Sequence, residues 1–104
     1  MYTRAFFLVE NKEKIMKILC TEVFEQQFKE ILQAFLQEDL DTTKRFKMYL
    51  ETLIINIPTK TQKYKRSIYF NDDNIRDLEH QGFIIPFYVD NESKDFIILG
   101  IIKK

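Results

Sequence analysis

The sequence predicts one α+β domain. An amino-terminal strand and an antiparallel helix hairpin precede a twisted antiparallel sheet of three to four carboxy-terminal strands, and the hairpin packs on that sheet. The chain has 104 residues, of which 45% are hydrophobic, and this length builds one core and not two. Two stretches in its middle carry apolar residues at helical spacing. Two short apolar runs near its end lie between turn-forming residues.

The last third of the chain, residues 74–104, is predicted to form the sheet. Residues 83–89 and 96–102 are short runs rich in Ile and Phe, and the polar insert 90–95 separates them. Short apolar runs bounded by turn residues favour strands over helices. Pro86 lies within the first run and has no N–H for a ladder hydrogen bond. We therefore expect either a bulge at Pro86, or that the side of the strand to which the Pro86 nitrogen points has no neighbouring strand.

The segment before these runs, residues 75–78, allows two interpretations. Asp72 or Asp73 could cap a helix that runs to His80. Alternatively, the segment is a strand that reverses at Gly82 into the first apolar run. We favour the strand, because it completes a three-stranded antiparallel meander and because of a family resemblance described below.

Two amphipathic stretches predict the helix hairpin. Residues 14–20 are expected to form a strand, after which Thr21 offers an N-cap for a helix over residues 22–38. A second helix is expected over residues 42–57, ending at Pro58 because the residue before a proline avoids the α region. The short link makes the helices antiparallel neighbours. Their apolar faces comprise Phe24, Phe28, Ile31, Leu32, Phe35 and Leu36 in the first and Phe46, Leu50, Leu53 and Ile57, widened by Tyr49 and Ile54, in the second.

The remaining segments carry weaker signals. Residues 59–64 are expected to form a loop, and residues 65–70 a short strand or an extended lead-in. Residues 71–74, Asn-Asp-Asp-Asn, indicate a turn. Residues 5–9 suit either a short edge strand or a helical turn.

Composition and motifs exclude several classes of protein. The formal net charge is zero, so a nucleic-acid role would depend on a local patch. Cys20 is the single cysteine, which excludes an intrachain disulfide and fits a reducing cytoplasm, and we expect it to be a buried small hydrophobe. The sequence has no run long enough to span a membrane, no phosphate-binding loop and no metal-ligand spacing. We therefore expect a soluble, cytoplasmic protein without a cofactor or a metal.

The order of these features resembles the RelE/ParE superfamily of bacterial toxin–antitoxin modules, and its ParE-like branch most closely. The stretches that carry the resemblance are, in order, Met16-Lys17-Ile18-Leu19 followed by Phe24 and Phe28; residues 39–46 followed by Leu50; Ile75-Arg76-Asp77-Leu78 followed by Gly82-Phe83; and residues 87–90 with 97–102. The resemblance covers residues 16–104 as a toxin-like domain and leaves residues 1–15 as an amino-terminal extension. It implies a helix hairpin on one face of the sheet, with the open face contacting the target.

The resemblance implies the toxin component of a type II toxin–antitoxin module, a class associated with plasmid stabilisation. A ParE-like toxin would bind and inhibit DNA gyrase, and a cognate antitoxin would neutralise it. RelE-like members instead cut mRNA in the ribosome and place Arg after the aromatic residue, where this sequence has Phe83-Ile84-Ile85. The chain also ends in Lys103-Lys104, without their Tyr or His. We therefore favour a protein without enzymatic activity and keep the ribonuclease, or a non-toxic interaction module, as alternatives.

The candidate binding residues are basic: Lys60, Lys63, Lys65, Arg66, Arg76, Lys103 and Lys104. The run from Lys60 to Arg66 contains no acid, so it could meet nucleic acid or the acidic surface of a partner, or serve as a solubilising loop. An incompletely paired strand edge at Pro86 would let an antitoxin add a strand or helix. The high apolar content also leaves room for a homodimer.

Two further residues have alternative roles. Arg76 comes from the family motif and either projects from the sheet toward a target or forms an ion pair with a nearby acid. The nearby acids are Asp72, Asp73 and Glu79. His80 is the only histidine and is expected in an exposed turn, solvated and not catalytic, so no catalytic residue is assigned.

Overall fold

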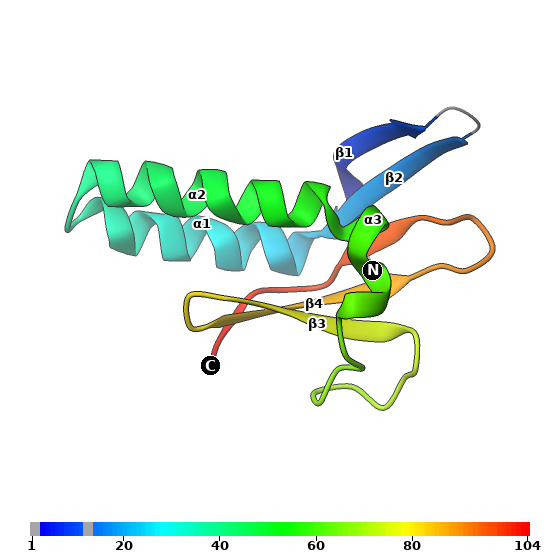
Figure 1. Cartoon of the computed structure of the whole chain (residues 1–104). Coiled ribbons are helices and arrows are strands. Elements are labelled where there is room, and N and C mark those ends of the chain that lie inside the picture. The colour runs from blue at the N-terminus through cyan, green and yellow to red at the C-terminus, as the bar shows by residue number, and fades with distance from the viewer. Residues whose placement is uncertain (1–2, 12–13) are drawn as a thin grey trace.

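The computed structural model describes residues 3–11 and 14–104, with side chains from residue 17 onward. Its strands are β1 (Thr3–Asn11), β2 (Lys14–Thr21), β3 (Ile75–His80), β4 (Phe83–Val89), β5 (Phe96–Ile98) and β6 (Ile102–Lys103). Its helices are α1 (Glu22–Leu36), α2 (Leu40–Ile55) and the short α3 (Ile57–Lys60), followed by a 3₁₀ turn at Thr61–Lys63. The hairpin of α1 and α2 lies along one face of β3 and β4 and extends past the turn between them (Figure 1). The predicted α+β class is confirmed.

The sheet has the strand order β1-β2-β5-β4-β3, and β6 pairs with β4. β3, β4 and β5 are antiparallel neighbours, so the predicted meander and the strand at 75–78 are confirmed. The sheet is not antiparallel throughout, however, because β2 runs parallel to β5, with Ile18 opposite Phe96. The helix hairpin carries the chain out and back, so β3 follows the direction of β2, and after two reversals β5 does too. The ambiguous segment 5–9 lies in β1, an edge strand antiparallel to β2.

α1 begins where the sequence predicts. The Thr21 hydroxyl accepts a hydrogen bond from the Phe24 N–H at 3.1 Å, and two acids, Glu22 and Glu25, lie in the first turn, where the helix dipole favours negative charge. The helix ends at Leu36, two residues before the predicted end. Its buried side chains include Phe24, which is 1% exposed and faces the sheet.

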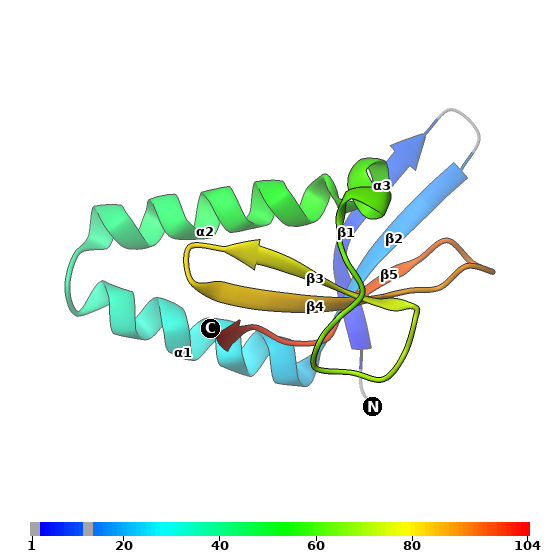
Figure 2. The ribbon, with the colours of Figure 1, turned by 60° about the horizontal axis from the view of Figure 1, so that its bottom comes forward.

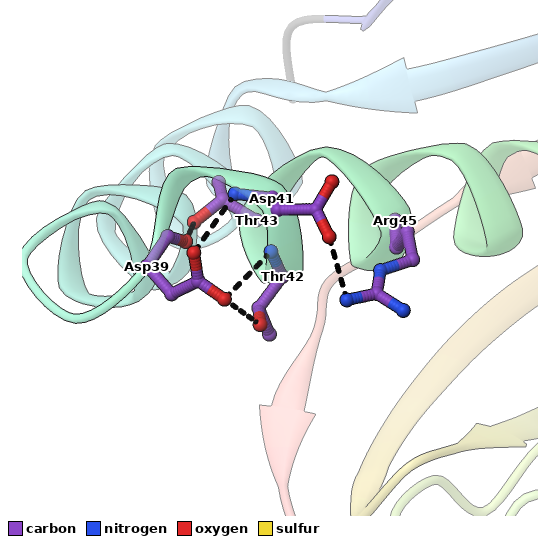
Figure 3. A network of polar contacts seen from close by, with 5 residues as sticks. All are labelled: Asp39, Asp41, Thr42, Thr43 and Arg45. Carbon is purple, nitrogen blue, oxygen red and sulfur yellow. Dashed lines mark hydrogen bonds and ion pairs between the residues drawn. The ribbon is translucent and has the colours of Figure 1, made fainter.

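α2 begins two residues earlier than predicted, with Asp39 as its N-cap. The Asp39 carboxylate accepts hydrogen bonds from the Asp41 N–H at 3.1 Å and from the Thr42 N–H at 3.3 Å (Figure 3). The Thr42 hydroxyl also donates to this carboxylate at 2.5 Å. The hydroxyl contact, followed by the Asp41 N–H, holds the pKa of Asp39 below its ordinary value. One turn further on, Arg45 pairs with Asp41 at 2.6 Å.

The end of α2 corrects two predictions. α2 ends at Ile55, and α3 follows at once with Pro58 in its first turn, where a helix does not need the missing N–H. Proline therefore marks a helix start here, and the predicted loop at 59–64 is wrong. Of the predicted apolar face, Phe46, Leu50, Ile54 and Ile57 are buried, whereas Tyr49 is 48% exposed. Phe35 of α1 packs on Phe46 with ring centroids 4.8 Å apart, which joins the two helices.

Pro86 leaves its own strand, β4, intact but interrupts the neighbouring strand, which divides into β5 and β6. β4 is continuous through Pro86, so of the two outcomes expected there the bulge does not occur. The Pro86 carbonyl accepts a hydrogen bond from the Leu99 N–H at 2.9 Å, but proline has no N–H to return to the Leu99 carbonyl. The predicted strand at 96–102 consequently divides into β5 and β6.

α1 supplies the missing hydrogen bonds at this division. The Thr21 hydroxyl donates to the Leu99 carbonyl at 2.9 Å, and the Gln27 side-chain oxygen accepts from the Ile101 N–H at 2.9 Å. Gly100 lies between these two bonds, and a Cβ there would come within 2.8 Å of the Gln27 oxygen. We call Thr21, Gln27 and residues 99–101 the seam, because they join the start of α1 to the sheet.

Candidate functional site

Four of the seven predicted basic residues lie around one depression of about 480 Å³. We call it the basic depression, and its basic residues are Lys63, Lys65, Arg66 and Lys104. Asp77 and Glu79 of β3 also line it, together with the apolar side chains of Ile68, Tyr69, Leu53, Leu78 and Ile84. It therefore combines basic, acidic and apolar groups where the segment between α3 and β3 lies against the sheet (Figure 2).

The other three predicted residues lie elsewhere. Lys60 lines a separate hollow with residues 58–63. Lys103 lies opposite Phe83 and borders an apolar groove of about 450 Å³ beside α1. Arg76 does not line the basic depression, so the seven residues do not form one patch.

Arg76 has a structural role, but with a different partner from the predicted acids. Its guanidinium Nη1 donates to the Tyr64 carbonyl oxygen at 2.6 Å. The Tyr64 ring in turn meets the Phe87 ring edge-on, with centroids 5.6 Å apart. Among the described side chains, Arg76 forms no ion pair with Asp72, Asp73 or Glu79. Arg76 therefore fastens the segment between α3 and β3 to the sheet through one of its guanidinium nitrogens.

The segment after Tyr64 is held by backbone hydrogen bonds along the outer edge of β3. The Asp77 N–H donates to the Lys65 carbonyl at 3.1 Å, and the Ser67 N–H donates to the Ile75 carbonyl at 2.7 Å. Within residues 65–70 the structure shows one isolated bridge, between Arg66 and Arg76, so of the two predicted alternatives the segment fits an extended lead-in better than a strand. The predicted turn at 71–74 is confirmed.

The charges around the basic depression are only partly paired. Arg66 contacts Asp73 at 3.1 Å, and Lys104 contacts Glu79 at 3.1 Å. Exposed pairs of this kind contribute about 0–1 kcal/mol. In the part of the chain with described side chains, Lys63 and Lys65 form no ion pair. These two lysines therefore supply the uncompensated positive charge.

His80 is not the exposed, solvated turn residue that the sequence predicts. It is the last residue of β3, and its ring lies against Phe46 of α2 with centroids 5.4 Å apart. Its Nε2 atom is buried and has no hydrogen-bond partner among the described residues. Burial lowers the pKa of His80, because desolvation disfavours the charged imidazolium. The ring faces the helix hairpin and is poorly placed to act on a ligand in the basic depression.

Cys20 is 2% exposed, as predicted for a small hydrophobe. Its Sγ lies 3.4 Å from the Glu25 carboxylate. No group of three or more His, Cys, Asp and Glu residues that could hold a metal ion occurs among the described residues. No helix in the described ranges is long and apolar enough to cross a membrane.

Sequence reasoning missed the acidic and apolar part of the basic depression. Asp77 appeared only as part of a family motif, yet its carboxylate accepts a hydrogen bond from the Ile68 N–H at 3.1 Å. Its second oxygen, Oδ1, is buried without a partner among the described residues. One sequence signal was available. Ile68, Tyr69 and Phe70 are three large apolar residues placed between a basic run and a turn, where loops are usually polar.

Comparison with known proteins adds no identification. No protein-family model matches the chain, and no curated protein is similar to it in sequence. The class defined by the structure is an α+β domain with a helix hairpin on a mixed sheet. Kinship with the RelE/ParE superfamily remains a prediction from the resemblance.

Proposed function

We propose that this chain is the toxin component of a type II toxin–antitoxin module. In this proposal it is ParE-like, acts in the cytoplasm by binding and inhibiting a protein target such as DNA gyrase, and is neutralised by a cognate antitoxin. One observation carries the proposal. The chain order of strand β2, helix hairpin and antiparallel strands β3, β4 and β5 is the order that the resemblance implies.

Two contacts favour a binding protein over a ribonuclease. A ribonuclease needs cations aimed at the reacting phosphate and a group that moves a proton. The Arg76 guanidinium instead holds the Tyr64 carbonyl, and the His80 ring packs on Phe46 with Nε2 buried. In these positions Arg76 has a structural contact, and the buried Nε2 of His80 faces no reacting group.

A supercoiling assay with purified DNA gyrase tests the proposal. The protein at micromolar concentration should abolish supercoiling. The double variant Lys63→Glu/Lys65→Glu should inhibit less, because it reverses the uncompensated charge of the basic depression. Lys44→Glu is the matched control, since Lys44 lies exposed on α2 and does not line the depression. Full supercoiling with the unmodified protein would contradict gyrase as the target.

Two measurements separate the alternatives. Primer extension on translating ribosomes would reveal new cuts within codons if the protein were a ribonuclease, and Arg76→Ala would remove them. Expression without an antitoxin would leave growth unchanged if the chain were a non-toxic interaction module. Growth arrest without mRNA cuts is the expected result.

A further inference from the structure

The tip of the segment between α3 and β3 exposes three large apolar side chains in succession. Ile68 is 82% exposed, Tyr69 46% and Phe70 41%. The other exposed large apolar residues of the described chain lie on the helices, singly or as a pair, and Met48 at 53% is one example. Consecutive exposed apolar residues at a loop tip indicate an interaction site more than scattered ones do.

Hydrogen bonds within the protein fix the tip. The Ile68 N–H donates to the Asp77 carboxylate at 3.1 Å, and the Tyr69 N–H donates to the Ser67 hydroxyl at 3.2 Å. These bonds tie the backbone of the tip to Asp77 and Ser67, while its side chains are exposed. A partner would therefore bind with little loss of loop entropy.

Arg66 closes the base of the tip. Its guanidinium contacts Asn71 Oδ1 at 2.8 Å and Asp73 Oδ1 at 3.1 Å, on the far side of residues 67–70. The positive charge of Arg66 is therefore already paired with the carboxylate of Asp73. The positive charge left for a partner is then that of Lys63 and Lys65, which line the basic depression together with Ile68 and Tyr69.

We propose that residues 68–70 and the basic depression form a docking site for an acidic segment of a partner protein that also carries large apolar side chains. The apolar side chains would pack on Ile68 and Tyr69, and the acids would face Lys63 and Lys65. The inference rests on the proposed function only for the existence of a protein partner. Beyond that, it names the partner's chemistry and does not require gyrase as the target.

A protein segment suits this site better than a nucleic acid. Ile68, the most exposed residue of the tip, is aliphatic and offers no ring on which a base could stack, and the aromatic Tyr69 and Phe70 are each less than half exposed. Asp77 and Glu79 line the same depression and would repel a phosphate backbone. A segment with spaced acids can place its charges at the lysines and its apolar groups at the tip.

Fluorescence anisotropy with synthetic peptides tests the site on the full chain. The first peptide alternates acids with Leu and Phe, the second replaces its acids by Lys, and the third replaces its apolar residues by Ser. Only the first peptide should bind, and added salt should weaken its binding. Ile68→Ser/Tyr69→Ser should weaken binding about tenfold, as for loss of a central apolar anchor. Lys63→Glu/Lys65→Glu should weaken it about threefold, as for charges at the rim.

Two variants serve as matched controls. Met48→Ser removes a comparably exposed apolar side chain from α2, and Lys44→Glu reverses a charge there, so neither should change binding. Equal binding of all three peptides, or no binding at millimolar peptide, would overturn the docking site. Tighter binding of a single-stranded oligonucleotide, lost in the same tip variant, would overturn it in favour of a nucleic acid. If the first peptide binds while gyrase stays active, only the proposed function fails.

Discussion

The seam and the tip at residues 68–70 both contain irregular backbone beside the sheet, but the side chains next to the seam are buried and those of the tip are exposed. At the seam, the Thr21 hydroxyl and the Gln27 amide bond the backbone between β5 and β6 and draw the neighbouring Ile98 and Ile101 into the core, where they are 0% and 2% exposed. At the tip, the Asp77 carboxylate bonds the backbone in the same way and leaves its neighbours outside. Side-chain hydrogen bonds thus fix the backbone in both places, and only burial separates a structural element from a candidate docking element.

The largest predicted effect is on the free energy of unfolding, and it compares a buried isoleucine beside the seam with the exposed isoleucine of the tip. Ile98→Ala should lower the free energy of unfolding by about 2–5 kcal/mol, because it removes a fully buried side chain and leaves a cavity. Ile68→Ala should change it by no more than about 0.5 kcal/mol, since Ile68 gains little from folding. Urea unfolding of both variants measures the difference. If Ile98→Ala does not fold, Ile98→Val should cost about 0.5–1.5 kcal/mol. Equal effects at the two positions would contradict the contrast between the regions.

A second prediction breaks the seam itself. Thr21→Val keeps the shape of the side chain but removes a hydroxyl that both caps α1 and donates to the Leu99 carbonyl. We expect a loss of about 1–3 kcal/mol, because a partly buried carbonyl and a helix N–H both lose a partner. Thr52→Val is the matched control, since the exposed Thr52 hydroxyl donates to the Met48 carbonyl within α2. Thermal unfolding that gives equal losses for both would refute the role assigned to the seam.

The regular elements were predictable because their signals are local. Helical spacing of apolar residues placed α1 and α2 within two residues, and short Ile- and Phe-rich runs placed β4 and the start of β5. The N-cap at Thr21 was also found, since its partner, the Phe24 N–H, lies three residues away.

The misses at Pro86, at His80 and among the basic residues involve partners distant in sequence, whereas the Asp39 N-cap and the helix start at Pro58 are local features. Whether Pro86 would disturb β4 or its neighbour depended on which side of the strand its nitrogen faces, and that is a property of strand pairing. His80 looked like a surface residue beside a glycine turn, but α2 covers its ring. Of the basic residues, proximity along the chain grouped Lys63 to Arg66 correctly and could not tell that Lys104 joins them while Lys60 does not.

A third, smaller prediction concerns the close approach of Gly100 to the Gln27 side chain in the seam. Gly100→Ala would place a Cβ 2.8 Å from the Gln27 oxygen, so Gln27 must move and weaken its bond to the Ile101 N–H. We expect a loss of about 1 kcal/mol for this bond. Gln27→Ala should cost a similar amount, and the double variant should cost less than the sum, with a coupling of about 0.5 kcal/mol or more. Additive losses in urea unfolding would show that the two residues act independently.

The smallest predicted effect concerns His80, whose buried nitrogen, unlike the seam's polar atoms, has no partner among the described residues. Burial lowers its pKa in the folded state from the ordinary value of 6.5, so the unfolded chain binds the proton more readily than the folded chain. The stabilising contribution is therefore complete above pH 6.5, falls as the pH drops below that value, and levels off below the folded-state pKa.

The test is the free energy of unfolding as a function of pH, with His80→Phe as the comparison. The unmodified protein should lose stability over this window, and His80→Phe should be flat there, because phenylalanine keeps the ring contact with Phe46 and has no proton to bind. Titration of Asp39 and Asp90 does not confuse the result, since both have pKa values lowered from 3.8 by hydrogen bonds, from Thr42 and Ser93 respectively, and titrate in more acidic solution. If the free energy of unfolding of His80→Phe still fell with pH over this window, the pH dependence would belong to other groups. Burial of the His80 imidazole would then have no measurable effect on stability.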